Sequence, residues 1–183
     1  MTNSALMVID LTNDFLAAWD KDRCAQLITA TNDLVEHFRA IGRPVIWVRQ
    51  EFRDDLNDAF LEMRDRTVKL NIIGTVGAEL DGRLAIRDGD IMIVKKRYSP
   101  FFGTDLDAVL AQKAICSLVI AGINTHACVR MAAIDAYQRD MRVILASEAI
   151  GSYDEEHARI SLRYMDGKIA RVMGIEAIRA DIT

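Results

Sequence analysis

The chain has 183 residues, which is enough for one domain with a sizeable core and short for two. Hydrophobic residues make up 51% of it and charged residues 27%, as in an ordinary globular protein. The formal net charge of −4 argues against a nucleic-acid surface. We therefore expect residues 1–183 to form a single domain without a nucleic-acid partner.

Neither the start of the chain nor its apolar runs predict a membrane protein. The first residues lack the basic segment of a secretory signal, and no apolar run approaches the roughly 18 residues that a membrane span needs. The three cysteines, Cys24, Cys116 and Cys128, are an odd number without a CxxC spacing, which favours reduced thiols over a cysteine-based zinc site. We expect a cytoplasmic protein with no membrane partner.

Short apolar runs alternate with segments of helical periodicity along the chain. The runs that predict strands lie at residues 5–9, 45–48, 91–94, 117–121, 141–146 and 170–173. Helical spacing is found at residues 23–41, at 104–112 with Thr104 as the N-cap, from 127 onward and at 154–165. This rhythm predicts an α/β fold with a parallel sheet that helices cover on both faces.

Residues 49–90 interrupt this rhythm. A short helix is predicted at 58–66, but the glycine-punctuated stretch 71–84 has no clear period. Long irregular segments inside compact domains are often binding loops or lids. We therefore expect this segment to determine substrate selectivity.

An acid, a cation and a thiol each follow a different predicted strand. Asp10 and Lys95 come directly after the runs 5–9 and 91–94, and Cys128 follows the run 117–121 at the first turn of a helix. Ligands of open parallel sheets lie beyond the carboxyl ends of the strands, so these side chains should share one crevice. A helix start favours anions, and we expect the Cys128 thiol to ionise more easily than a free thiol.

This trio suits nucleophilic catalysis, although each member also has a plainer structural interpretation. Lys95 would stabilise the thiolate, Asp10 would move the thiol proton to a leaving amine, and backbone amides of residues 124–128 would bind the oxyanion. Alternatively, Asp10 caps a turn, Lys95 is a solvated charge and Cys128 packs in the core. His126 lies two residues before Cys128, and such neighbours diverge near a helix start, so we expect no Cys–His pair.

Three segments resemble the motifs of the isochorismatase-like cysteine hydrolases, a family that includes nicotinamidases and N-carbamoylsarcosine amidases. They are VIDLTNDF at residues 8–15, VKKRYSPF at 94–101 and GINTHACV at 122–129. The resemblance implies a Rossmann-like three-layer α/β/α sandwich with a mostly parallel six-stranded sheet. It also implies a triad of Asp10, Lys95 and Cys128, and an assembly of two or more copies. A cis peptide between Ile123 and Asn124 would aim the amides of Asn124 and Cys128 at the oxyanion.

Two departures from the family narrow the chemistry. Residues 49–90 contain no histidine, whereas metal-dependent nicotinamidases carry several there, so we expect no metal and no other cofactor. Siderophore-pathway isochorismatases have glycine at the nucleophile position, where this chain has Cys128. This favours hydrolysis of an amide or carbamoyl C–N bond in a small molecule through a thioester. The alternatives are a vinyl-ether hydrolase in which Asp10 is the proton donor, and a non-catalytic ligand-binding or thiol redox-sensing module.

Residues beside the motifs are candidates for substrate binding. Phe15, Tyr98 and Phe101 could wall the pocket, although core packing explains them nearly as well. Arg97 and Arg130 are candidate anchors for a substrate carboxylate. The apolar residues near the C-terminus, which could serve the core or an interface between copies, are Ile160, Met165, Ile169 and Met173.

Overall fold

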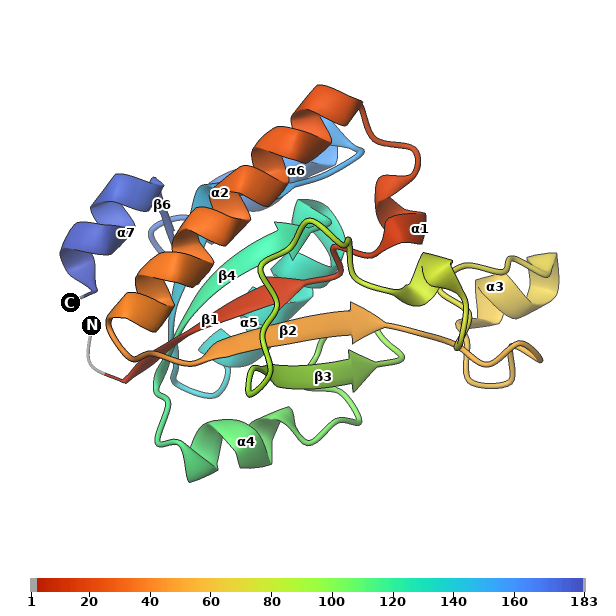
Figure 1. Cartoon of the computed structure of the whole chain (residues 1–183), viewed down its shortest axis with the longest axis horizontal. Coiled ribbons are helices and arrows are strands. Elements are labelled where there is room, and N and C mark those ends of the chain that lie inside the picture. The colour runs from red at the N-terminus through yellow and green to blue at the C-terminus, as the bar shows by residue number, and fades with distance from the viewer. Residues whose placement is uncertain (1–2, 183) are drawn as a thin grey trace.

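A six-stranded sheet forms the centre of the protein in a computed structural model that describes residues 3–182 (Figure 1). The strands are β1 (Ser4–Ile9), β2 (Val45–Gln50), β3 (Ile91–Lys95), β4 (Ser117–Ile123), β5 (Arg142–Gly151) and β6 (Arg171–Met173). Their order is β3-β2-β1-β4-β5-β6, and every neighbouring pair is parallel. The predicted parallel α/β architecture is confirmed.

Helices cover both faces of this sheet. They are α1 (Asn13–Leu16), α2 (Lys21–Ala40), α3 (Leu61–Arg66), α4 (Leu106–Gln112), α5 (Arg130–Tyr137), α6 (Glu155–Met165) and α7 (Ile175–Asp181), with a 3₁₀ turn η1 (Val76–Ala78) and a π turn η2 (Thr125–Val129). Leu6 and Val8 of β1 pack in the core beneath α2 and α7. Met7 and Ile9 pack on the opposite face with α4, α5 and the end of α6. Both faces of β1 are buried, which explains why its sequence is apolar without alternation.

The chain changes direction between β1 and β4. From β1 it proceeds outward through β2 to β3, and it then returns to β4 and proceeds outward on the other side through β5 to β6. The carboxyl ends of β1 and β4 therefore flank the topological switch point of the sheet. Crevices at such points are where open α/β sheets bind ligands.

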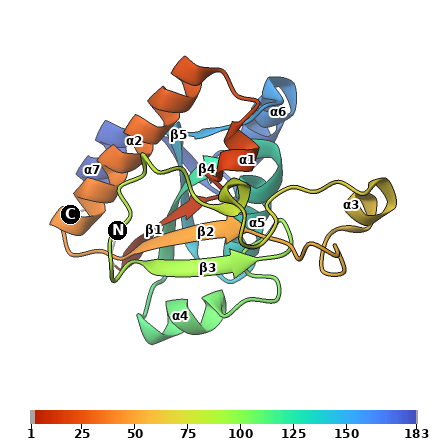
Figure 2. The ribbon, with the colours of Figure 1, turned by 45° about the vertical axis from the view of Figure 1, so that its right-hand side comes forward.

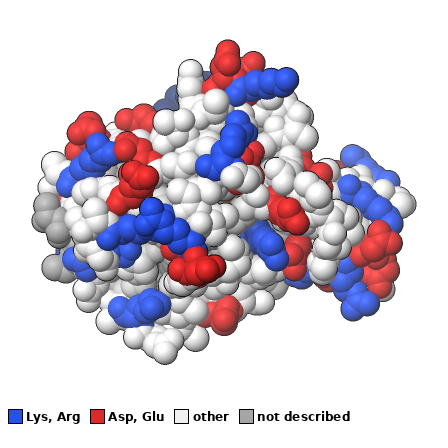
Figure 3. Space-filling view, viewed as in Figure 1, with Lys and Arg blue, Asp and Glu red and all other residues white. Residues whose placement is uncertain are grey.

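Residues 51–90 form an excursion at the carboxyl end of β2, and both ribbon views show α3 projecting from the body there (Figures 1 and 2). Its first part packs on a small apolar cluster of its own, made by Phe52, Leu56, Ala59 and Ile72, whereas Leu80 and Leu84 pack in the main core. Side chains of Lys and Arg lie interspersed with those of Asp and Glu over the face shown in Figure 3, including the projecting lobe.

Several predicted boundaries differ from the structure. The N-cap of α4 is Asp105 and not Thr104, whose hydroxyl bonds Pro100 and accepts the N–H of Leu106 at 3.2 Å. The predicted helix at 58–66 begins only at α3, because Asp58 is engaged in a turn with Arg53. Helix α7 was not predicted from the sequence. No helix within residues 3–182 has the length and apolar character needed to cross a bilayer.

Candidate active site

The three residues predicted to converge lie together at the carboxyl edge of the sheet. Asp10 follows β1, Lys95 is the last residue of β3, and Cys128 lies in η2 after β4. Lys95 Nζ is 2.6 Å from Asp10 Oδ2 and donates a hydrogen bond to Cys128 Sγ at 3.4 Å. None of these residues is more than 4% exposed. The predicted convergence is confirmed, and their catalytic roles stay predictions.

A close approach of β1 and β4 brings two of these residues to one crevice. Gly122 pairs with Ile9, and its φ of +107° belongs to a region that favours glycine. A Cβ at Gly122 would lie only 2.0 Å from the carbonyl oxygen of Ile9. Because Gly122 has no side chain, β1 and β4 can approach each other closely at this pair. Asp10 follows at the end of β1, and the turn that carries Cys128 follows at the end of β4.

The turn after β4 is closed by backbone hydrogen bonds. The peptide bond between Ile123 and Asn124 is cis, as the family resemblance implied. The carbonyl of Asn124 then accepts the N–H groups of Ala127 at 3.0 Å and Val129 at 3.2 Å. These bonds wind residues 125–129 into a π turn, which places the Cys128 side chain against the sheet.

The electrostatics of the trio differ from the sequence-based expectation for the thiol. Burial raises the pKa of Asp10 above its usual range, and Lys95 only partly opposes this effect. Burial disfavours the Lys95 ammonium, but the charges of Asp10 and Cys128 outweigh it and raise its pKa. Burial, reinforced by Asp10, also raises the pKa of Cys128. The prediction of an easily ionised thiol is therefore wrong, because burial and the neighbouring Asp10 disfavour the thiolate more than Lys95 favours it.

Cys128 lines a cavity of about 550 Å³ at this edge. The cavity wall also contains Asn124 and combines polar side chains, among them Asp14, with apolar ones such as Met131. Its size is that of a small-molecule site. A carbonyl compound placed there would meet a buried sulfur, with Lys95 and Asp10 directly beside it.

The predicted substrate-binding residues separate into two groups. Phe15, Tyr98 and Arg130 line this cavity. Phe101 and Arg97 do not, so their predicted contact with substrate is corrected by the structure. Phe101 is instead buried in the core. The guanidinium of Arg139, just after α5, lies 4.4 Å from the centroid of the Phe101 ring.

Arg97 is engaged with the backbone behind the cavity. Its guanidinium donates hydrogen bonds to the carbonyls of Asp58 at 2.8 Å and Lys96 at 2.7 Å, and it lies 5.1 Å from the ring centroid of Phe60. The sequence could not show this, because two of its three partners lie about 40 residues away in the irregular segment. Arg97 therefore supports Phe60, whose ring contacts Tyr98 of the cavity wall.

Gln50 is a lining residue that the sequence analysis missed. Its side chain is 2% exposed and reaches the cavity, and its Nε2 has no hydrogen-bond partner among residues 3–182. Gln50 ends β2, two residues beyond the predicted strand end, so the rule that located Asp10 and Lys95 would also have located it. A buried amide without a partner is costly, and a substrate oxygen would satisfy it.

His126 also lines the cavity but interacts with Ser152 instead of Cys128. Its Nδ1 is 2.5 Å from Ser152 Oγ, which itself accepts the N–H of Asp154 at 3.3 Å. Burial lowers the pKa of His126, although the Asp154 carboxylate opposes this effect. These contacts agree with the expectation that His126 and Cys128 form no dyad.

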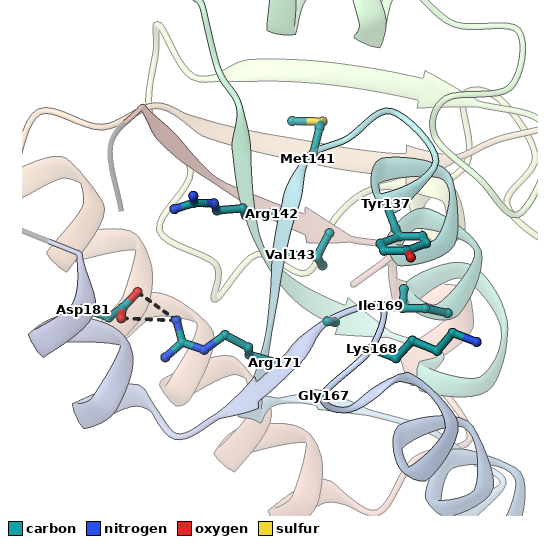
Figure 4. A pocket seen from close by; sticks show the side chains of 10 residues that line it. Tyr137, Met141, Arg142, Val143, Gly167, Lys168, Ile169, Arg171 and Asp181 are labelled. Atoms are coloured by element: carbon teal, nitrogen blue, oxygen red, sulfur yellow. Dashed lines mark hydrogen bonds and ion pairs between the residues drawn. The ribbon is translucent and has the colours of Figure 1, made fainter.

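The other end of the sheet carries a separate hollow of about 590 Å³ (Figure 4). Arg142 and Arg171, the first residues of β5 and β6, line it together with Asp181, whose carboxylate pairs with Arg171 at 3.2 Å. It is larger than the cavity at Cys128 but lies at the opposite edge from the trio.

Within residues 3–182, no group of three or more His, Cys, Asp or Glu side chains is arranged to hold a metal ion.

A parallel α/β sheet with a buried acid, cation and thiol at its carboxyl edge defines the class of α/β cysteine hydrolases. The sequence model of the isochorismatase domain matches residues 4–177, and the chain belongs to this family of hydrolases.

Three similar proteins illustrate this membership. The chain is 38% identical over 146 residues to a probable inactive nicotinamidase of Arabidopsis thaliana, with 75% of this chain and 74% of that protein covered. An isochorismatase family protein from Desulfovibrio vulgaris superposes with a TM-score of 0.91 at 25% identity, covering 98% of both chains. N-carbamoylsarcosine amidase from Thermoplasma acidophilum superposes with a TM-score of 0.80 at 27% identity, covering 94% of this chain and 96% of that one.

Proposed function

We propose that this protein hydrolyses the C–N bond of a small carboxamide or carbamoyl compound through a thioester on Cys128. The observation that carries the proposal is the buried contact series from Asp10 through Lys95 to Cys128, at 2.6 Å and 3.4 Å, beside a cavity of small-molecule size. The similarity to an N-carbamoylsarcosine amidase supports this reaction class.

Acylation begins with the neutral thiol that the free site favours. The carboxylate of Asp10 takes the thiol proton as the sulfur of Cys128 attacks the carbonyl carbon, so the S–H bond breaks while C–S and O–H bonds form. The carbonyl π electrons move to oxygen. When the tetrahedral adduct collapses, the C–N bond breaks and Asp10 gives its proton to the departing nitrogen. The raised pKa of Asp10 suits this role, because a more basic carboxylate removes the proton more readily.

Deacylation reverses the use of the same groups. Asp10 accepts a proton from water as the water oxygen attacks the thioester carbon, and it returns this proton to sulfur when the C–S bond breaks. Lys95 stays charged throughout and stabilises each transient anion on sulfur. The backbone amides of Asn124 and Cys128 are the proposed donors to the oxyanion. The products are a free acid and an amine or ammonia.

Trapping the acyl-enzyme tests this proposal directly. The wild-type protein is mixed with primary amides or ureido acids and quenched in acid. Its mass is then measured by mass spectrometry, both intact and after digestion to peptides. We expect an added mass equal to the acyl group on the peptide that contains Cys128, and no added mass in Cys128→Ala. Turnover in Cys128→Ala should fall by about 10⁴-fold or more, as for other enzymes that lose their nucleophile.

The same variants distinguish the vinyl-ether alternative. If Cys128→Ala hydrolyses isochorismate at the wild-type rate while Asp10→Asn does not, the proposed thioester chemistry is wrong. If no amide, ureido acid or isochorismate is turned over and no acyl mass appears, the assignment as this kind of hydrolase is wrong as well.

A further inference from the structure

The cavity at Cys128 lies beside a second one, which we call the annex. The annex has a volume of about 390 Å³ and shares the lining residues Phe15, Gln50, Leu70 and Tyr98 with the catalytic cavity. The shared lining residues place the two cavities side by side. A substrate bound at Cys128 would reach the annex past these shared side chains.

The annex has a different chemical character from the catalytic cavity. Its own walls are the apolar side chains Phe52, Phe60, Leu61 and Met63, contributed by the excursion and by α3. Among residues 3–182, Glu62 is the one charged residue that lines the annex, and it pairs with Arg66 at 3.1 Å, so no Lys or Arg of this part of the chain lines the annex. A negatively charged group would find no cation here, whereas an apolar group would be removed from water on several sides.

The aromatic wall of the annex is held in place from behind. The Phe60 ring lies 5.9 Å from the ring of Phe52 and 5.0 Å from that of Tyr98, both centroid to centroid. The guanidinium of Arg97 lies 5.1 Å from the same ring and is anchored on the carbonyl of Asp58. An edge-to-face ring pair, a tilted ring pair and a bound guanidinium fix this surface before any ligand arrives.

At the rim, two apolar side chains are left uncovered. Leu61 is 64% exposed and Leu70 is 38% exposed, although both line the annex. Exposed apolar side chains around a concave, apolar space are typical of a ligand site. The volume of about 390 Å³ is that of a small-molecule site.

We propose that the annex is a subsite for an uncharged apolar arm of the substrate, such as a phenyl-bearing or branched aliphatic chain attached to the scissile carbonyl. This inference rests on the proposed function for the reaction at Cys128 and adds the class of substrate. The polar end of the substrate is held at Cys128 and Asn124, and the arm lies between Phe60 and Leu61.

Turnover of a matched amide series tests the subsite. We expect kcat/KM for 3-phenylpropionamide to exceed that for propionamide by about 10-fold to 100-fold, since burial of an aromatic group contributes this much. In Leu61→Asp the ratio of the two values should fall about tenfold or more. Leu61→Met should keep it. The matched control is Val76→Asp, because Val76 is 70% exposed and lines neither cavity, and this variant should keep the wild-type ratio.

A binding measurement separates failure of the subsite from failure of the proposed function. Isothermal titration calorimetry of the wild-type protein with 3-phenyl-1-propanol and with 1-propanol needs no hydrolysis. We expect the phenyl alcohol to bind about tenfold more tightly or better, and Leu61→Asp to remove the difference. Equal binding of both alcohols, or a flat amide series in an active enzyme, would overturn the subsite. Preferential binding of the phenyl alcohol by a protein that turns over no amide would support the subsite and reject the hydrolase.

Discussion

At the scale of single residues, the most consequential feature is the ion pair of Asp10 and Lys95. Both side chains are fully buried, and their charged atoms lie 2.6 Å apart. Removing two charges from water is costly, and only their mutual attraction compensates for it. The pair is therefore stable as a unit, and neither member is tolerated alone.

Lys95→Met is expected to lower the free energy of unfolding by about 3–5 kcal/mol, because it leaves a buried carboxylate without a counter-charge. The double variant Asp10→Asn with Lys95→Met removes both charges and should recover part of this loss while staying inactive. Urea denaturation at pH 7, followed by circular dichroism, measures both effects. Equal stability of the single and double variants would show that the two charges are not coupled.

The thiol of Cys128 makes stability depend on pH in the alkaline range. Its pKa in the folded protein is raised above the ordinary value of 9.0. At a pH between the pKa of the unfolded thiol and that of the folded thiol, the folded state holds a proton that the unfolded state has lost. The stabilisation is present below pH 9 and is lost as the pH rises. From pH 7 to pH 10, ionisation of the unfolded thiol should remove on the order of 1 kcal/mol.

Cys128→Ala lacks this ionisation and serves as the comparison. Its free energy of unfolding should decline less than that of the wild-type protein between pH 7 and pH 10, by a difference on the order of 1 kcal/mol. Guanidinium denaturation at several pH values gives both curves, and titrating groups away from Cys128 cancel in their difference. Parallel curves would contradict the raised pKa.

At the scale of elements, the site depends on how closely β1 and β4 approach. The paired residues Ile9 and Gly122 stand directly before the two segments that carry Asp10 and Cys128. The absence of a side chain at Gly122 therefore sets the width of the crevice. Backbone strands cannot move apart locally without weakening the sheet hydrogen bonds on both sides.

Gly122→Ala is expected to destabilise the protein by about 3 kcal/mol or more, through overpacking against the Ile9 backbone and an unfavourable positive φ. The matched control is Gly82→Ala, because Gly82 is exposed and a Cβ there meets nothing within 4 Å. It should change stability by less than about 0.5 kcal/mol. Thermal or urea unfolding distinguishes the two, and similar losses for both would reject this role of Gly122.

At the scale of the whole molecule, several apolar side chains of α5 and α6 remain uncovered. Met131, Tyr137, Ile160 and Tyr164 are each more than a third exposed. Of the four residues named from the sequence as candidates for an interface, Met165 and Ile169 are instead buried in the core. Of the four residues named from the sequence, only Ile160 is exposed. Met131, Tyr137 and Tyr164 therefore replace the other three as candidates for an interface.

We propose, on the basis of the family resemblance, that the protein assembles into dimers or larger oligomers. The expected result is elution from a sizing column, at micromolar concentration, above the 20.5 kDa of one chain. Multi-angle light scattering on the same column gives the mass independently of shape. A species with the mass of one chain would contradict this prediction.

The sequence by itself determined the parallel α/β class of the fold and the position of the trio. Strands buried on both faces are continuous apolar runs, and in a parallel sheet their carboxyl ends meet at one edge, so Asp10, Lys95 and Cys128 could be brought together without knowledge of packing. The resemblance added the cis peptide after Ile123, which the structure contains.

Only the tertiary structure decided the properties that depend on distant neighbours. The pKa of Cys128 rises because burial and Asp10 outweigh the helix start that the local sequence suggested. The guanidinium of Arg97 lies against Phe60, far along the chain, and Phe101 is enclosed by the core. Beyond the short helix predicted at 58–66, the excursion that forms the annex showed no clear period, and the residues of its own apolar cluster come from separate stretches of it. Periodic patterns report which face of an element is buried, whereas pKa values and pocket walls arise from contacts between segments that no local pattern encodes.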